Sequence, residues 1–308
     1  MRVFRAIAAA VAVLSVTAAG AGAQSFAGGD ISTARAGFGL SLALGENELL
    51  VGEPNNSSRP GEIHIFRPGP SGWERAGGLT APDAEPSDGF GQKLFLSGNT
   101  LFVGVPSAEG NRGTVHVFER AGDGWSHSGE LTGDDLEGVN RFGTAIAATG
   151  EFAFVSAPVQ NQAAGAVYVF RRSAAGWTQA GKLTTDSAAV QPLFGNALAA
   201  ADGTLFVSAP GVNENRGQVT IFSQDAATGE WTSAGMLPTP EVDANSRFGW
   251  AMTHADGTLI VSAPAANDET GAAYAFRQSD GAWTQQAQLS PPSPAPNTVF
   301  GIQLASDG

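Results

Sequence analysis

Carboxylates gather in three short segments of the chain, and two carboxylates at a defined separation can hydrolyse glycosidic bonds. The segments contain Asp83, Glu85 and Asp88, then Asp134, Asp135 and Glu137, then Glu241 and Asp243. Closely spaced carboxylates can also bind a cation. Because the sequence does not show that any two of these side chains converge, we interpret the segments as a solvated acidic rim. Weak cation binding and a catalytic pair are the alternatives.

Two Asn-Arg-Gly triplets stand in other polar segments, at residues 111–113 and 215–217. Asparagine and glycine accept a positive φ, so both triplets are typical of turns. Their arginines could also contact a ligand. We therefore predict one set of ligand-binding residues: Asn111, Arg112, Asn215 and Arg216, together with Asp134, Asp135 and Glu137.

The four histidines show no pattern that predicts catalysis or metal binding. His64 and His116 each lie two residues before a phenylalanine that ends a hydrophobic run. The equivalent residues elsewhere in the chain are Tyr168, Thr220 and Tyr274. We interpret a position that accepts His, Tyr or Thr as the surface of a β-strand. His127 and His254 have no H-x-x-x-H partner, so we predict no metal ligand.

Nucleophilic and phosphate-binding motifs are also missing from the sequence. The chain has no cysteine, hence no thiol nucleophile, and it contains neither a G-x-S-x-G elbow nor a P-loop. We expect no catalytic residue and no bound cofactor, and a non-enzymatic function.

The secondary-structure elements that position these residues follow a sequence repeat. Phe-Gly pairs recur at spacings of 52, 52, 52, 54 and 52 residues, beginning at Phe38, Phe90, Phe142, Phe194, Phe248 and Phe300. A proline follows the first five phenylalanines by 16 residues, and a tryptophan precedes each later Phe-Gly by 17. A period of about 50 residues indicates a repeat architecture.

Each repeat contains four short runs typical of β-strands. In the second repeat they cover residues 90–97, 101–105, 113–118 and 125–131. Four strands per unit of this length predict an all-β fold, a β-propeller of four-stranded blades over residues 38–308. A solenoid of β units is the alternative. We expect the phenylalanines and tryptophans to fill the packing between blades, and the glycine of each Phe-Gly to admit a neighbouring backbone.

In a four-stranded meander, alternate connections share one side of the sheet. The first-to-second and third-to-fourth turns are short here, whereas the other two connections are long and variable, as at residues 107–112 and 132–141. Because long loops on a rigid scaffold often bind ligands, we expect function at the long-loop side.

The Phe-Gly pairs and the later Gly-Glu-Pro, Gly-Val-Pro or Ser-Ala-Pro triplets resemble the FG-GAP repeat of integrin alpha-chain propellers and of secreted bacterial proteins. The resemblance covers residues 38–308 and implies a propeller. Some integrin repeats carry a D-x-D-x-D-G calcium loop between the first two strands. Here that position is a pair such as Gly98-Asn99 or Asp202-Gly203, so no calcium ligand is carried over, and calcium remains an open alternative.

The two ends of the chain predict export and truncation. Two arginines, a small apolar run over residues 6–19 and Ala21-Gly22-Ala23 predict a signal peptide over residues 1–23, followed by a lead-in over 24–37. The run is too short and too alanine-rich for a membrane anchor. The sixth repeat, beginning at Phe300, stops within its first hairpin, so we expect a fragment of a ring of six or seven blades.

The net charge of the chain limits the classes of binding partner. Without residues 1–23, 14 Lys and Arg face 29 Asp and Glu, a net charge of −15, which disfavours nucleic acid and anionic membranes. We predict a secreted or periplasmic binding or adhesion module for an extracellular protein or glycan. An extracellular polysaccharide hydrolase or lyase, or a scaffold within a longer secreted protein, is the alternative.

Overall fold

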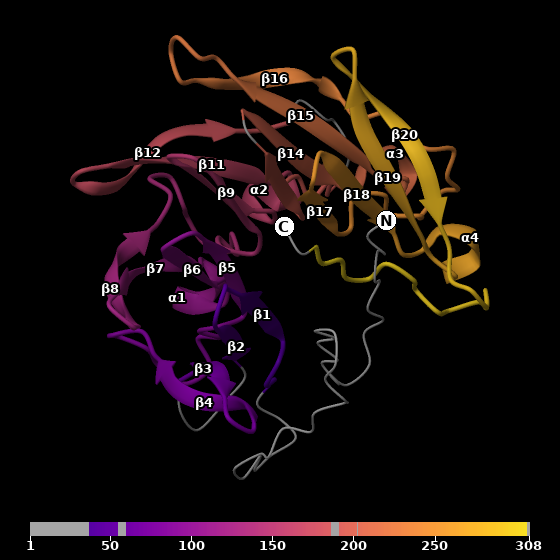
Figure 1. Cartoon of the computed structure of the whole chain (residues 1–308). Helices are drawn as coiled ribbons and strands as arrows, with labels where there is room; N and C mark the ends of the chain where they lie inside the picture. Colours follow the sequence, from indigo (N-terminus) through magenta and orange to yellow (C-terminus); the bar gives the residue numbers. More distant parts are fainter. Residues whose placement is uncertain (1–36, 55–59, 186–190, 202, 307–308) are drawn as a thin grey trace. The chain divides into compact units, whose positions relative to one another are not determined.

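The computed structural model describes residues 37–54, 60–185, 191–201 and 203–306. Over these residues the chain forms five four-stranded antiparallel sheets, each with its strands in sequential order (Figure 1). The predicted all-β fold of propeller blades is confirmed, and the sheets are called blades 1 to 5. The predicted signal peptide and residues 24–36 of the lead-in lie outside the described residues.

The strands of each blade follow the repeat. Blade 1 contains β1 (Ser41–Leu44), β2 (Leu49–Glu53), β3 (Glu62–Gly69) and β4 (Gly72–Leu79). Blade 2 contains β5 (Lys93–Ser97), β6 (Thr100–Val105), β7 (Thr114–Ala121) and β8 (Gly124–Leu131). Blade 3 contains β9 (Ile146–Thr149), β10 (Phe152–Ala157), β11 (Ala166–Ser173) and β12 (Gly176–Leu183). Blade 4 contains β13 (Leu198–Ala201), β14 (Thr204–Ala209), β15 (Gln218–Gln224) and β16 (Trp231–Met236). Blade 5 contains β17 (Met252–Ala255), β18 (Thr258–Ala263), β19 (Ala272–Ser279) and β20 (Ala282–Leu289).

Four single helical turns lie in the connections between the second and third strands of blades 2 to 5. They are α1 (Ala108–Asn111), α2 (Gln160–Ala163), α3 (Val212–Asn215) and α4 (Ala266–Glu269). Each contains three residues with positive φ, for example Asn213, Glu214 and Asn215 in α3. They are therefore tight turns, which agrees with the absence of a helical period in the sequence.

The short hairpins are confirmed, but the first strand begins later than predicted. In blade 2, Ser97 pairs with Thr100, which leaves a two-residue turn at Gly98-Asn99. The strand β5 starts at Lys93, because Gly91 has a φ of +88° and the amide of Gln92 donates to the carbonyl of Gly89 at 2.9 Å. The Phe-Gly pair is therefore the turn that leads into the blade.

The third and fourth strands of every blade are joined across a β-bulge. In blade 2, Val117 faces Gly129 and Phe118 faces His127, so Ser128 is the extra residue. Its hydroxyl donates to the carbonyl of Val117 at 3.1 Å. A bulge moves the residues beyond it to the other face of the strand. Residues 127 and 130 of β8 therefore face the same side of the sheet, which strict alternation would forbid.

The repeated aromatic residues form the core. Phe90, Phe142, Phe194 and Phe248 are at most 1 % exposed. In blade 4, the ring of Trp231 packs edge-to-face on Phe154 of blade 3, with centroids 4.7 Å apart. A Cβ added to Gly249 would lie 2.8 Å from the Cβ of Ser208. The Trp231 contact confirms the predicted packing of the Trp between blades, whereas the close neighbour of Gly249 is the side chain of Ser208, with the backbone carbonyl of Gln218 at 3.4 Å.

The described residues divide into two compact units between Thr132 and Gly133. Blades 1 and 2 form the N-terminal unit, and blades 3 to 5 form the C-terminal unit. Each unit is described by itself below.

Candidate functional site

The long loops meet at one side of the blades in the C-terminal unit. The loop before blade 5 runs beside the α3 turn of blade 4: the amide of Asn245 donates to the carbonyl of Glu214 at 2.9 Å, and that of Arg247 to Asn215 at 2.8 Å. The same pairing recurs one repeat later, from Val299 to Glu269 at 2.8 Å. The predicted grouping of the two long connections is confirmed for these blades.

A hollow opens at this long-loop side of blade 5. It has a volume of about 520 Å³, and its polar and aromatic lining includes Asp243, Asn245, Arg247, Trp250, Asp268 and Glu269. The guanidinium of Arg247 lies 5.4 Å from the centre of the Trp250 ring, within the range of a cation–π contact. The lining thus combines an aromatic ring, a cation, an amide and three carboxylates.

The predicted ligand residues of blade 4 lie beside this lining. The side chain of Asn215 donates to Asn245 at 2.9 Å. Arg216 pairs with Glu214 of its own turn at 2.6 Å. Asn215 is exposed and Arg216 is half-buried. The positive φ of Asn215, +58°, confirms the predicted turn.

The equivalent residues of blade 2 form an exposed turn in the N-terminal unit. Asn111 has a φ of +72°, as predicted for its turn, and its amide donates to the carbonyl of Ser107 at 3.2 Å. Arg112 pairs with Glu109 three residues earlier. Both side chains of this ion pair are about half exposed.

The acidic residues 134–137 fold onto blade 3. Asp135 accepts hydrogen bonds from Tyr168 and from Lys182, both at 2.5 Å, and Asp134 accepts one from Gln179 at 2.8 Å. Lys182 and then Tyr168 lower the pKa of Asp135. Glu137 is exposed, and its backbone carbonyl accepts a bond from the side chain of Asn140 at 3.0 Å. All three acids are exposed, as predicted for an acidic rim, but Asp134 and Asp135 are also bonded to strand residues of blade 3.

Within the C-terminal unit, the predicted ligand residues make separate sets of contacts. Asn215 touches the hollow lining, whereas Asp134 and Asp135 bond within blade 3. Sequence reasoning missed Trp250, Arg247 and Asp268. Trp250 had a signal in the sequence, because the residue after Phe-Gly is Leu40, Gln92, Thr144, Asn196 or Ile302 in the other repeats. A single large aromatic there departs from the repeat.

The position occupied by His116, Tyr168 and Tyr274 is buried, so interpreting it as a strand surface was wrong. These residues are 4 %, 0 % and 3 % exposed. The phenylalanine of each Phe-Gly covers them: Phe90 packs edge-to-face on His116 at 5.5 Å, and Phe142 on Tyr168 at 5.4 Å. Burial raises the pKa of Tyr168 and Tyr274.

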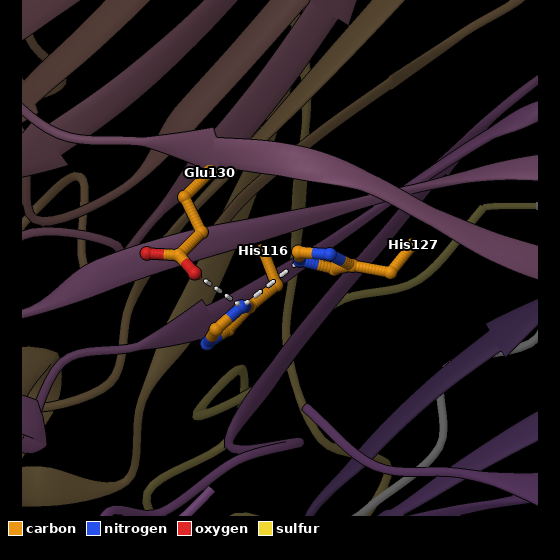
Figure 2. Close-up of side chains that lie close together, drawn as sticks. All are labelled: His116, His127 and Glu130. Carbon is orange, nitrogen blue, oxygen red and sulfur yellow. Dashed lines mark hydrogen bonds and ion pairs between the residues drawn. The ribbon is translucent and has the colours of Figure 1, made fainter. Parts of the chain in front are cut away.

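In blade 2 this buried position belongs to a cluster with metal-ligating chemistry. Nδ1 of His116 lies 3.3 Å from Nε2 of His127 and 3.5 Å from a carboxylate oxygen of Glu130 (Figure 2). Burial, and to a smaller degree the charge of His127, lowers the pKa of His116 to about 4, although Asp83 and Asp88 act in the opposite direction. At neutral pH its imidazole is therefore uncharged, and its nitrogens can act as ligands.

The family model of the FG-GAP repeat matches residues 73–118 and 125–170. The chain contains FG-GAP repeats. Each matched FG-GAP segment begins in the fourth strand of one blade, at β4 or β8, and ends in the third strand of the next, at β7 or β11. No curated protein matches the chain. Among the described residues, the helices are too short to cross a membrane.

Proposed function

We propose that this FG-GAP repeat protein is an exported, non-enzymatic binding or adhesion module that recognises an extracellular protein or glycan through its long-loop side. The observation that carries the proposal is the hollow beside blade 5. Binding sites are usually concave and combine apolar surface with a few polar groups. The Trp250 ring offers the apolar surface, and Asn245, Arg247 and Asp243 offer the polar groups.

The break in the repeat supports this location. Residues that only maintain a blade recur from unit to unit, as the buried Phe90, Phe142, Phe194 and Phe248 do. Trp250 stands directly after such a phenylalanine and glycine, yet it is one of the residues that line the hollow. A ring that stacks on the face of a sugar or on an apolar side chain suits a polar ligand that also needs hydrogen bonds.

Export is part of the proposal. Basic residues, a small apolar run and the Ala-Gly-Ala segment support a signal peptide at residues 1–23. The strong negative charge supports a ligand other than a polyanion.

Binding to glycan arrays and to immobilised extracellular proteins tests the proposal, with the full chain carrying no affinity tag. Trp250→Ala is expected to weaken binding by more than about tenfold, since truncating a central aromatic residue commonly costs 2 kcal/mol or more. The matched control is Thr144→Ala, which changes the same repeat position in blade 3. Repeating the assay with calcium and with a chelator separates cation-dependent binding.

Two results would contradict the proposal. Equal binding by Trp250→Ala and Thr144→Ala would show that the hollow does not take part in ligand binding. Release of new reducing or unsaturated sugar ends from a polysaccharide would support the hydrolase or lyase alternative instead.

A further inference from the structure

Two strands of blade 2 direct three metal-ligating side chains to one point. His116 lies on β7, while His127 and Glu130 lie on β8, and Figure 2 shows both β8 side chains directed to the same nitrogen of His116. The β-bulge at Ser128 makes this convergence, because it brings residues 127 and 130 to the face that His116 occupies.

The distances fit a small cation with tetrahedral coordination. Zinc binds histidine nitrogen at about 2.0–2.1 Å and carboxylate oxygen at about 2.0–2.2 Å, which places neighbouring ligands about 3.3–3.5 Å apart. The separations from Nδ1 of His116 are 3.3 Å to His127 and 3.5 Å to Glu130. All three ligand atoms lie within 4.8 Å of one another.

The charges around the cluster also favour a cation. In blade 3, Lys182 occupies the position of Glu130 and pairs with Asp135. In blade 2, Asp83 stands 52 residues before Asp135 and acts electrostatically on His116. Glu130 therefore adds a second negative charge where blade 3 has a lysine. Two imidazoles beside these carboxylates form a site that a divalent cation would complete.

Solvent access and the type of ligand atom limit which metal ion the cluster would bind. His116 is buried, His127 is half-buried and the side chain of Glu130 is 40 % exposed, so the cluster reaches solvent at its carboxylate. Imidazole nitrogens suit zinc and other late first-row metals, whereas calcium prefers six to eight oxygens.

Among the five described blades, blade 2 alone combines these ligands at the three positions. The equivalent sets are His64, Arg75 and Gly78 in blade 1; Tyr168, Gln179 and Lys182 in blade 3; Thr220, Ser233 and Met236 in blade 4; and Tyr274, Gln285 and Gln288 in blade 5. The blade scaffold itself therefore does not require a metal ligand there.

We propose that His116, His127 and Glu130 bind one zinc ion, with the remaining coordination position open to water or to an oxygen of a ligand. This inference does not rest on the proposed function.

Calorimetric titration of the chelator-treated, tag-free full chain with Zn²⁺ tests the site. We expect one ion per chain, with His127→Ala and Glu130→Gln each weakening the affinity by more than about tenfold. Gln285→Ala, which changes the position of His127 in blade 5, is the matched control and should leave the affinity unchanged. Calcium at the same concentrations should neither bind here nor displace zinc.

Cobalt(II) provides a second readout. Four-coordinate cobalt absorbs strongly in the visible range, and we expect this absorption in the parent chain and in Gln285→Ala but not in His127→Ala. Circular dichroism checks that each variant is folded. If His127→Ala does not fold, Glu130→Gln, which changes an exposed side chain, still tests the site. Absence of zinc binding by the parent chain, or equal affinity in folded Glu130→Gln and Gln285→Ala, would overturn the proposal.

Discussion

Blades 2 and 3 use the same bulged pair of strands for different purposes. In blade 3, Tyr168 and Lys182 hold the loop residue Asp135, and Gln179 holds Asp134. In blade 2, the same three strand positions carry His116, His127 and Glu130, which lie close to one another. The comparison teaches that the bulge supplies the geometry, while the residue types decide whether the position fastens a loop or presents ligands.

The largest effect on stability is expected from removing the buried ring that blades 2 and 3 carry at the equivalent position, His116 or Tyr168. Tyr168→Ala should lower the free energy of unfolding by about 3–5 kcal/mol, because the ring is fully buried and packs on Phe142. His116→Ala should lower it less in metal-free protein, since a smaller ring is lost. Urea unfolding followed by tryptophan fluorescence measures both. Equal losses would mean that His116 is as structural as Tyr168.

Charge reversal tests the blade 2 site directly. Glu130→Lys gives blade 2 the cation that Lys182 provides in blade 3, so zinc affinity should fall by more than about tenfold. Without metal, the new lysine should stabilise the fold by at most about 1 kcal/mol through Asp83. Titration calorimetry and urea unfolding measure the two effects, with Gln288→Lys in blade 5 as the matched control. If Glu130→Lys retained its zinc affinity, the difference between blades 2 and 3 at this position would not explain zinc binding.

A smaller effect concerns pH in blade 3. Lys182 and Tyr168 lower the pKa of Asp135, so its contribution to stability is present above the unfolded value of about 3.9 and is lost as pH falls through the lower folded value. Lys182→Met should cost about 0.2–1 kcal/mol at pH 7 and little once Asp135 is protonated. Unfolding curves measured between neutral and acidic pH test this. A loss that stays constant at low pH would show that packing by the lysine stem, and not its charge, is responsible.

The smallest effect is expected at the loop turn of blade 2. Arg112→Ala should change the free energy of unfolding by no more than about 0.5 kcal/mol, because the side chain is exposed and pairs with Glu109 of its own turn. Blade 3 has Ala164 at this position. Thermal unfolding of the variant measures the change. A loss above 1 kcal/mol would indicate that the turn of blade 2 has a structural role that blade 3 lacks.

Much of the fold was predictable, because a blade is built from local contacts repeated along the chain. The Phe-Gly, Pro and Trp positions predicted the blades, and Gly98-Asn99 predicted the first hairpin of blade 2 to the residue. The start of β5 was wrong by three residues, since Phe90 and Gly91 form a turn before the strand. Asn111 and Asn215 have the positive φ that their residue type predicted, but Ala163 and Glu269 have a positive φ at the same position, so the turn itself also imposes it.

The sites were less predictable, because they depend on residues that meet across strands and loops. His127 and Glu130 are three residues apart, and an unbroken strand would place them on opposite faces. Only the bulge at Ser128 reverses this. Likewise, nothing in the composition of residues 134–137 indicated that Lys182, 47 residues later, would hold Asp135.

The sequence by itself determined the repeat, the four strands of each blade and the position of the long loops, because period, turn residues and strand propensity act over short distances. The tertiary structure alone decided which side chains converge. It buried His116 beneath Phe90, fastened Asp135 to blade 3 and opened the hollow beside Trp250. These outcomes rest on strand register and packing, which bring together residues that the linear pattern keeps apart.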